Sequence, residues 1–218
     1  VGSDYTLVYN VLSFGTAVMF GAFVYFLTQM KSVSKQYQAG VAVSAIVVGI
    51  AGYHYYRIWS DFGEGVMNEG YRYADWLITV PLLIIELLIV LGVAQKDRTS
   101  LMLKLVPATI LMVGLGYPGE VADGNGAKWT FWVLAMIPFA YILKTLYAEL
   151  QKAGQRETGA VAKQIKNATY VLLTTWLVYP IAYLFPIFDG DSEALETLRQ
   201  VGYTFADITA KGLYLSLI

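Results

Sequence analysis

Seven apolar segments dominate this 218-residue chain and limit what it can fold into. A helix needs about 20 apolar residues to cross the hydrocarbon core of a bilayer, and each segment is about that long. Because the connections are short and no second domain is evident, the sequence predicts an all-α membrane protein. Its expected form is one seven-transmembrane-helix bundle over residues 1–218. The segments span residues 5–29, 39–59, 72–94, 100–117, 129–149, 168–187 and 199–218.

The composition agrees with a membrane protein. Hydrophobic residues make up 57% of the chain and charged residues only 14%, whereas soluble domains carry about 25% charged residues. The chain has no cysteine, which excludes disulfides and thiolate sites. No basic cluster is present, so we expect no nucleic-acid partner.

The charges in the connections predict the orientation, because cytoplasmic loops are enriched in Lys and Arg. Connections 1–2, 3–4 and 5–6 are basic and the opposite side is acidic. The N-terminus is therefore expected outside and the C-terminus in the cytoplasm. The basic residues are Lys31, Lys35, Lys96, Arg98, Lys104, Lys144, Lys152, Arg156, Lys163 and Lys166. The acidic ones are Asp4, Asp61, Glu64, Glu69, Glu120, Asp123, Asp189, Asp191, Glu193 and Glu196.

Three connections have distinctive compositions. Residues 118–128 and 186–196 are rich in turn-forming residues and are predicted as exterior loops. Residues 151–166 are rich in Lys, Arg and Gln and predict a solvated cytoplasmic loop or a helix extension.

The third segment carries charges that are costly inside a bilayer and that usually mark function. Asp75, Thr79 and Glu86 fall within roughly 40° of one another on one helical face. The two carboxylates are then about 16 Å apart along the axis, at about 1.5 Å per residue, too far for direct proton transfer. This separation suits two proton-carrying sites with a further functional group placed between them. The orientation puts Asp75 nearer the exterior and Glu86 nearer the cytoplasm.

The seventh segment contains a second polar pair. Asp207 and Lys211 are four residues apart and share a helical face near the middle of the bilayer. They could form a buried ion pair that only fixes helix packing. Alternatively, a buried lysine is a suitable amine for a Schiff base, because desolvation frees the nucleophile.

These motifs resemble those of the microbial (type 1) rhodopsins over essentially the whole chain. The third segment has Arg72-Tyr73-x-Asp75-Trp76-x-x-Thr79-x-Pro81-Leu82, the sixth Trp176-x-x-Tyr179-Pro180, and the seventh Asp207-x-x-x-Lys211.

The resemblance implies that Lys211 carries all-trans retinal as a protonated Schiff base, with Asp75 and Asp207 as counterions. A buried iminium needs a nearby anion to keep its proton. Arg72 can offset the excess negative charge of the two carboxylates. Thr79, one turn inward of Asp75, can hydrogen-bond the Asp75 carboxylate.

The set Asp75, Thr79 and Glu86 is similar to that of the proteorhodopsin and xanthorhodopsin branch. The resemblance implies a light-driven outward proton pump, a transporter rather than an enzyme, with Asp75 as proton acceptor and Glu86 as proton donor. A photosensory rhodopsin that signals to a partner protein is the alternative, although such receptors usually lack the donor carboxylate. A third possibility is a seven-helix scaffold without a chromophore, in which Asp207 and Lys211 are purely structural.

His54 is the only histidine of the chain. A lone histidine is often structural. In the proteorhodopsin-like branch, however, a histidine at the matching place bonds the acceptor carboxylate. By that resemblance we expect His54 to pair with Asp75, within or between protomers, and to tune its pKa.

The retinal pocket carries over residue by residue, although ordinary membrane packing is the alternative for each aromatic residue. Tyr55 matches a tyrosine that bonds the Asp207 partner. Leu83 occupies a position linked to spectral tuning, and an apolar residue there implies green rather than blue absorption. The other expected pocket residues are Trp76, Met112, Gly116, Trp132, Trp176, Tyr179, Pro180 and Tyr183.

Two departures limit the resemblance. Some xanthorhodopsin-like pumps have a glycine that admits an antenna carotenoid beside the retinal ring; here Trp132 stands at that position, so we expect no such antenna. No paired-glutamate release group of the haloarchaeal type is evident, which leaves Glu120, Glu193 and Glu196 as candidates for proton release.

Family members form trimers or pentamers, and we expect a homo-oligomer in the lipid of a prokaryotic plasma (inner) membrane.

Overall fold

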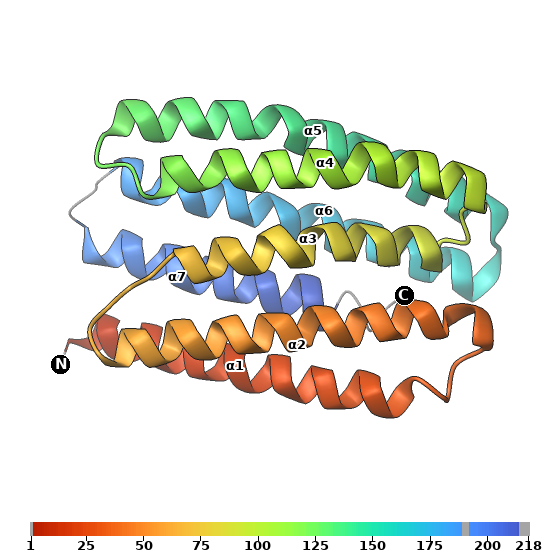
Figure 1. The fold of residues 1–218 in the computed structure, drawn as a ribbon, viewed down its shortest axis with the longest axis horizontal. Helices are drawn as coiled ribbons and strands as arrows, with labels where there is room; N and C mark the ends of the chain where they lie inside the picture. The colour runs from red at the N-terminus through yellow and green to blue at the C-terminus, as the bar shows by residue number, and fades with distance from the viewer. Residues whose placement is uncertain (1, 189–191, 214–218) are drawn as a thin grey trace.

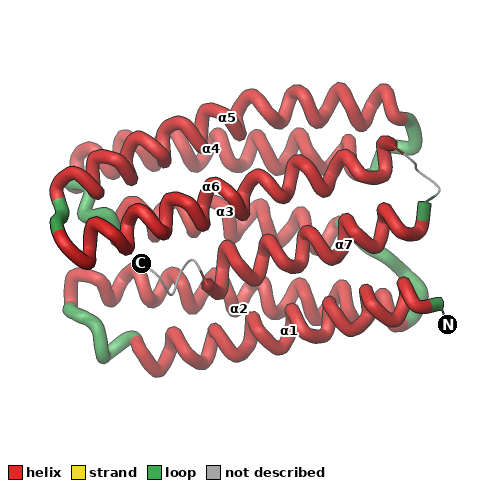
Figure 2. Tube along the Cα trace, turned by 180° about the vertical axis from the view of Figure 1, so that it is seen from behind, coloured by secondary structure: helices red, strands yellow, loops and turns green. Residues whose placement is uncertain are grey.

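The computed structural model describes residues 2–188 and 192–213, and within these ranges it contains helices and no strand. Each helix packs against the next one along the chain, and α7 packs against α1, so the bundle closes on itself (Figures 1 and 2). The prediction of an all-α seven-helix bundle is thereby confirmed. The elements are α1 (Ser3–Gln29), α2 (Lys35–Gly63), α3 (Gly70–Val90), α4 (Gln95–Glu120), α5 (Asn125–Arg156), α6 (Gly159–Phe188), α7 (Glu193–Asp207) and the π-helical segment η1 (Ile208–Leu213).

The connections sort to the two ends of the bundle as the charge pattern predicts. Figure 1 shows the α1–α2, α3–α4 and α5–α6 connections at one end, which we call the basic end. The start of α1 and the α2–α3 and α4–α5 connections lie at the opposite end, which we call the acidic end. Helices α1 to α6 are each long and apolar enough to span a membrane. Together with the fold, this makes the chain an integral membrane protein.

The helices extend beyond the apolar segments. Residues 151–166 are mostly helical, because α5 continues to Arg156 and α6 begins at Gly159. At the acidic end α6 reaches Phe188 and α7 begins at Glu193, so most of the loop predicted over 186–196 is helical or lies outside the described residues. Asp189, Asp191 and residues 214–218 of the seventh segment are also outside them.

The loop predicted over 118–128 is wrong for most of its length. Helix α4 continues through Pro118 to Glu120, and α5 already begins at Asn125. The buried Glu120 side chain accepts hydrogen bonds from Tyr73 and Tyr203 and pairs with Arg199. These contacts to α3 and α7 hold the last turn of α4 in place despite Pro118, although proline usually disrupts a helix. A prediction from local turn-forming residues does not take such contacts between helices into account.

Apolar side chains line the inside of the bundle and also much of its outside. Leu12, Val47 and Ile142 are among the fully buried ones. Phe14, Ile137 and other large apolar side chains point outward. A helix bundle that is apolar on its outer face suits a lipid environment, since lipid tails solvate such side chains.

Candidate functional site

Lys211 lies between two aspartates in the middle of the bundle. Its Nζ donates to Asp75 Oδ2 at 2.5 Å and to Asp207 Oδ1 at 2.8 Å. All three side chains are fully buried. Asp75 comes from α3, whereas Asp207 ends α7 and Lys211 lies in the π-helical segment that follows. Wider π-helical turns often occur at functional sites.

Asp207 is held by donors from three further side chains. Tyr55 and Tyr179 donate their hydroxyls at 2.7 and 2.8 Å, and Trp76 Nε1 donates at 3.1 Å. The bond expected between Tyr55 and Asp207 is therefore present. Arg72 Nη1 donates to Tyr55 at 3.0 Å and lies 3.7 Å from Asp207 Oδ2. This guanidinium offsets the second carboxylate, since two anions face one lysine.

Asp75 is held much less firmly. Its Oδ1 has no hydrogen-bond partner among the described residues. Contrary to expectation, Thr79 does not bond the Asp75 carboxylate: its hydroxyl donates to the Asp75 backbone oxygen at 2.8 Å. Threonine in a helix commonly bonds the carbonyl four residues earlier, and here that local bond is preferred. Asp75 thus keeps a carboxylate oxygen free to take a proton.

His54 lies near Asp75 without a hydrogen bond to it. The distance from His54 Nδ1 to Asp75 Oδ1 is 4.0 Å. The same nitrogen lies 3.0 Å from the backbone oxygen of Ile50, one turn earlier in α2. A charge on His54 would still act on Asp75 at this distance.

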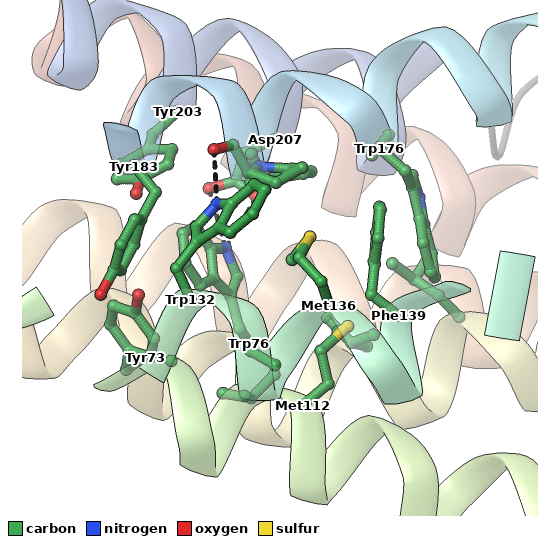
Figure 3. A pocket seen from close by; sticks show the side chains of 18 of the residues that line it. Tyr73, Trp76, Met112, Trp132, Met136, Phe139, Trp176, Tyr183, Tyr203 and Asp207 are labelled. Atoms are coloured by element: carbon green, nitrogen blue, oxygen red, sulfur yellow. Dashed lines mark hydrogen bonds between the residues drawn. The ribbon is translucent and has the colours of Figure 1, made fainter. Parts of the chain in front are cut away.

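An apolar cavity extends from Lys211 between α3, α4, α5 and α6 (Figure 3). The aromatic rings around the cavity pack against one another. Trp76, for example, makes edge-to-face contacts with the rings of Tyr179 and Tyr203. The nine sequence-predicted pocket residues that line it are Trp76, Leu83, Met112, Gly116, Trp132, Trp176, Tyr179, Pro180 and Tyr183. Lining residues that were not among the predicted pocket residues include Tyr73, Val80, Val113, Ala135, Met136, Phe139 and Tyr203.

Three contacts shape the wall of the cavity. Trp132 Nε1 donates to the Pro180 backbone oxygen at 2.9 Å, which ties α5 to α6 across one side. At Gly116 a Cβ atom would lie 3.2 Å from the Tyr73 ring, so the absence of a side chain there preserves both the ring position and the free space. Tyr183 donates to the Lys128 backbone oxygen at 3.1 Å.

Glu86 lies in α3 toward the basic end and is fully buried. Ser44 of α2 donates to Glu86 Oε1, and Oε2 has no partner among the described residues. Sequence reasoning missed Ser44. A serine within the apolar stretch of α2 was the available signal, but only the register between α2 and α3 places it opposite Glu86. A small apolar pocket lined by Leu83, Leu146 and Leu172 adjoins the turn of α3 that carries Glu86, and Ala210, the residue before Lys211, also lines it.

Polar side chains form a network between Arg72 and the acidic end. Arg72 donates to Gln200 at 2.8 Å and to Glu69 at 3.3 Å. Gln200 in turn donates to Glu69 and to Glu196. The chain of contacts thus leads from the buried site to Glu196, whose side chain is 41% exposed.

Arg199 connects the carboxylates of this network. It pairs with Glu120, with Glu196 at 2.7 Å and with Glu69 at 3.4 Å. Two of the release candidates, Glu120 and Glu196, are therefore brought together. Glu193, the third, makes none of the described hydrogen bonds of this network.

A seven-helix membrane bundle whose buried lysine faces two aspartates beside a cavity lined by aromatic rings has the arrangement expected of a microbial rhodopsin. The chain belongs to the family described as bacteriorhodopsin-like protein, whose profile it matches over residues 7–218. It is a type 1 microbial rhodopsin.

Individual relatives agree with this assignment. The green-light absorbing proteorhodopsin of Gamma-proteobacterium EBAC31A08 is 32% identical, over 97% of this chain and 84% of the relative. Among solved structures, xanthorhodopsin, described as a light-driven ion pump with dual chromophore, superposes with a TM-score of 0.92 at 39% identity. The match covers all of this chain and 92% of that one. Thermophilic rhodopsin gives the same TM-score, identity and coverage.

Proposed function

We propose that this protein is a light-driven outward proton pump with all-trans retinal bound covalently to Lys211. The observation that carries the proposal is the placement of Lys211 Nζ beside Asp75, with a second buried carboxylate, Glu86, farther along α3 toward the basic end. The relatives described as proteorhodopsin and as a light-driven ion pump support the same function.

The residues present fit retinal. The cavity is apolar, bounded by aromatic rings and lined by Lys211, so an apolar polyene joined to that amine has an apolar enclosure around it. The two aspartates supply the negative charge that a cationic nitrogen needs in a buried site. Bound retinal supplies light absorption and an isomerisation that redirects the bond between Nζ and its proton.

Asp75 acts as the proton acceptor. It lies within hydrogen-bond distance of Nζ and has an uncommitted oxygen. Asp207, held by Tyr55, Tyr179 and Trp76, remains the standing countercharge. Because Asp75 lies toward the acidic end, its proton moves in the outward direction that the basic loops define.

Glu86 acts as the proton donor that returns a proton to Nζ. Ser44 fixes the position of its carboxyl group, the Glu86 side chain is fully buried, and Leu83, Leu146 and Leu172 line a small apolar pocket beside the same turn of α3. A carboxyl group enclosed by apolar side chains can retain a proton until a transient path to Nζ forms. Glu86 is then refilled from the basic end.

The remaining assignments follow from the same proposal. One retinal-binding domain spans residues 1–218, in a prokaryotic plasma membrane, as a homo-oligomer with three or five protomers. Leu83, which lines the cavity, favours green absorption. Trp132 covers the side of the cavity that a carotenoid antenna would use, and its bond to Pro180 supports the absence of such an antenna.

The test is illumination of unbuffered cells that express the protein and are supplied with retinal. The expected result is acidification of the medium that a protonophore abolishes, with none in cells expressing Lys211→Ala. Alkalinisation that a protonophore enhances would contradict outward proton pumping and indicate another ion. A photocycle without any pH change would favour the photosensory alternative.

A further inference from the structure

A second cavity opens at the basic end, apart from the site around Lys211. It has a volume of about 220 Å³ and lies among α2, α3, α5 and α6. Tyr37, Glu157 and Gln164 form its exposed rim, whereas Leu91 and Ala153 form a buried floor. It shares no lining residue with the cavity beside Lys211.

Two helices lead from this cavity to Glu86. On α2, Tyr37, Gly40 and Ser44 are spaced by three and four residues, so they follow one another along one face. On α3, Val90 lies one turn from Glu86 toward the basic end. Tyr37 and Val90 line the cavity, while Ser44 is hydrogen-bonded to Glu86.

One packed layer separates the cavity from the carboxyl group. A Cβ atom added to Gly40 would lie 3.1 Å from Val90 Cγ2, so the backbone at Gly40 and the Val90 side chain are in close contact. This layer is one helical turn thick. Toward Lys211, by contrast, Glu86 and Asp75 are eleven residues apart on α3, about three helical turns, and the buried Leu83 and Thr79 lie between them along the helix. The cavity and the Glu86 carboxyl group are thus about one helical turn apart along α3, with the contact between Gly40 and Val90 at that turn.

We infer that this cavity is the inlet through which Glu86 is reprotonated, with the Gly40–Val90 contact as its barrier and Glu157 as the carboxylate that collects protons at its mouth. The inference deepens the proposed pump and rests on it. A proton from bulk water binds Glu157, passes through water in the cavity and protonates the Glu86 carboxylate at its unpartnered Oε2. Glu157 returns to its ionised form, and no electron transfer is involved.

Arg156 holds the floor of the inlet. Its Nη2 donates to the Leu91 backbone oxygen at 2.6 Å and so ties the end of α5 to the end of α3. A cation suits the carboxyl end of α3, where helix carbonyls lack partners. Arg156 is therefore a positioning residue that fixes the wall of the cavity.

The barrier is tested by hydrogen–deuterium exchange of the Glu86 carboxyl group in the dark, followed by its infrared C=O band after transfer into D₂O. Glu86→Gln identifies the band. Val90→Ala should accelerate the exchange about fivefold, equivalent to about 1 kcal/mol of activation free energy. Gly40→Ala should slow it by a similar factor, and the double variant should lie near the wild type. Val41→Ala, which does not line the cavity, is the matched control and should have no effect.

Proton collection is tested in the retinal-loaded protein with a pH-indicator dye after a flash. Glu157→Gln should slow proton uptake about threefold or more, whereas Glu149→Gln, two turns earlier within α5 and outside the cavity, should not. Exchange and uptake unchanged in all cavity variants, while Glu86→Gln still slows the photocycle, would overturn the inlet and leave the pump intact. A photocycle indifferent to Glu86→Gln would instead refute Glu86 as donor, and with it the proposed route.

Discussion

Lys211 Nζ lies 2.5 Å from Asp75 Oδ2, although 136 positions of sequence separate the two residues. Among the described residues the Asp75 carboxylate has no other hydrogen-bond donor, whereas Asp207 accepts from Tyr55, Trp76 and Tyr179 in addition to Lys211. A proton that neutralised Asp207 would weaken several charge-assisted bonds, while one that neutralised Asp75 would weaken a single bond. This asymmetry distinguishes an acceptor from a permanent counterion.

Asp75→Asn should remove the acceptor and preserve the shape of the site. We expect proton transfer from Nζ to slow by about 10²-fold or more, the usual contribution of a positioned acid or base. Flash spectroscopy of the purified protein measures this step. Transfer at the wild-type rate would exclude Asp75 as acceptor.

Lys211→Ala should abolish the visible chromophore, because it removes the buried amine that would bind retinal. Among the described residues that line the cavity, the other side-chain nitrogens are the indoles of Trp76, Trp132 and Trp176. The absorption spectrum after addition of all-trans retinal is the measurement. As a control, Lys152→Ala changes an exposed lysine and should leave the spectrum unchanged. A visible band that persists in Lys211→Ala would refute the linkage.

Glu86→Gln should slow the return of the proton to Nζ by about 10²-fold. Ser44→Ala should have a smaller effect, since it removes one hydrogen bond to the protonated carboxyl group, worth about 0.5–1.5 kcal/mol. The decay of the deprotonated state after a flash reports both. Equal effects of the two variants would mean that Ser44 does more than position Glu86.

His54→Ala should change the pH at which the visible absorbance shifts to the red as Asp75 is protonated. The reason is the 4.0 Å distance between the two side chains, at which a charge on the imidazole acts on the carboxylate. A titration of the absorption spectrum gives the midpoint. An unchanged midpoint would leave His54 with a purely structural role.

Arg199→Gln should destabilise the acidic end. Removal of this cation leaves the buried Glu120 without its charged partner, and breaking a buried pair costs about 3–5 kcal/mol. Thermal loss of the visible absorbance measures the effect. The double variant Arg199→Gln with Glu120→Gln should recover part of the stability, and failure to recover any would show that the ion pair is not the cause.

The helices and the central polar residues were predictable because both follow from local patterns. Apolar length marks the spans, and the spacing of Asp75 and Glu86 along one helix fixes their face and separation. Ser44 and the Arg199 network were not predictable, because their partners lie on other helices and depend on how those helices are aligned. The same reason explains the loop prediction at Pro118: the local signal favoured a turn, and Glu120 is held by Arg199, Tyr73 and Tyr203.

The bonds from α2 to its neighbours also fix how far the helices can slide along one another. Ser44 reaches Glu86 near one end of α2, and Tyr55 reaches both Arg72 and Asp207 farther along the same helix. A slip of one turn would displace a helix by about 5.4 Å and separate every one of these pairs at once. Apolar side chains alone would tolerate many such alignments in lipid. The charged residues that carry the proposed transport therefore also specify a single alignment of α2, α3 and α7 during assembly of the bundle.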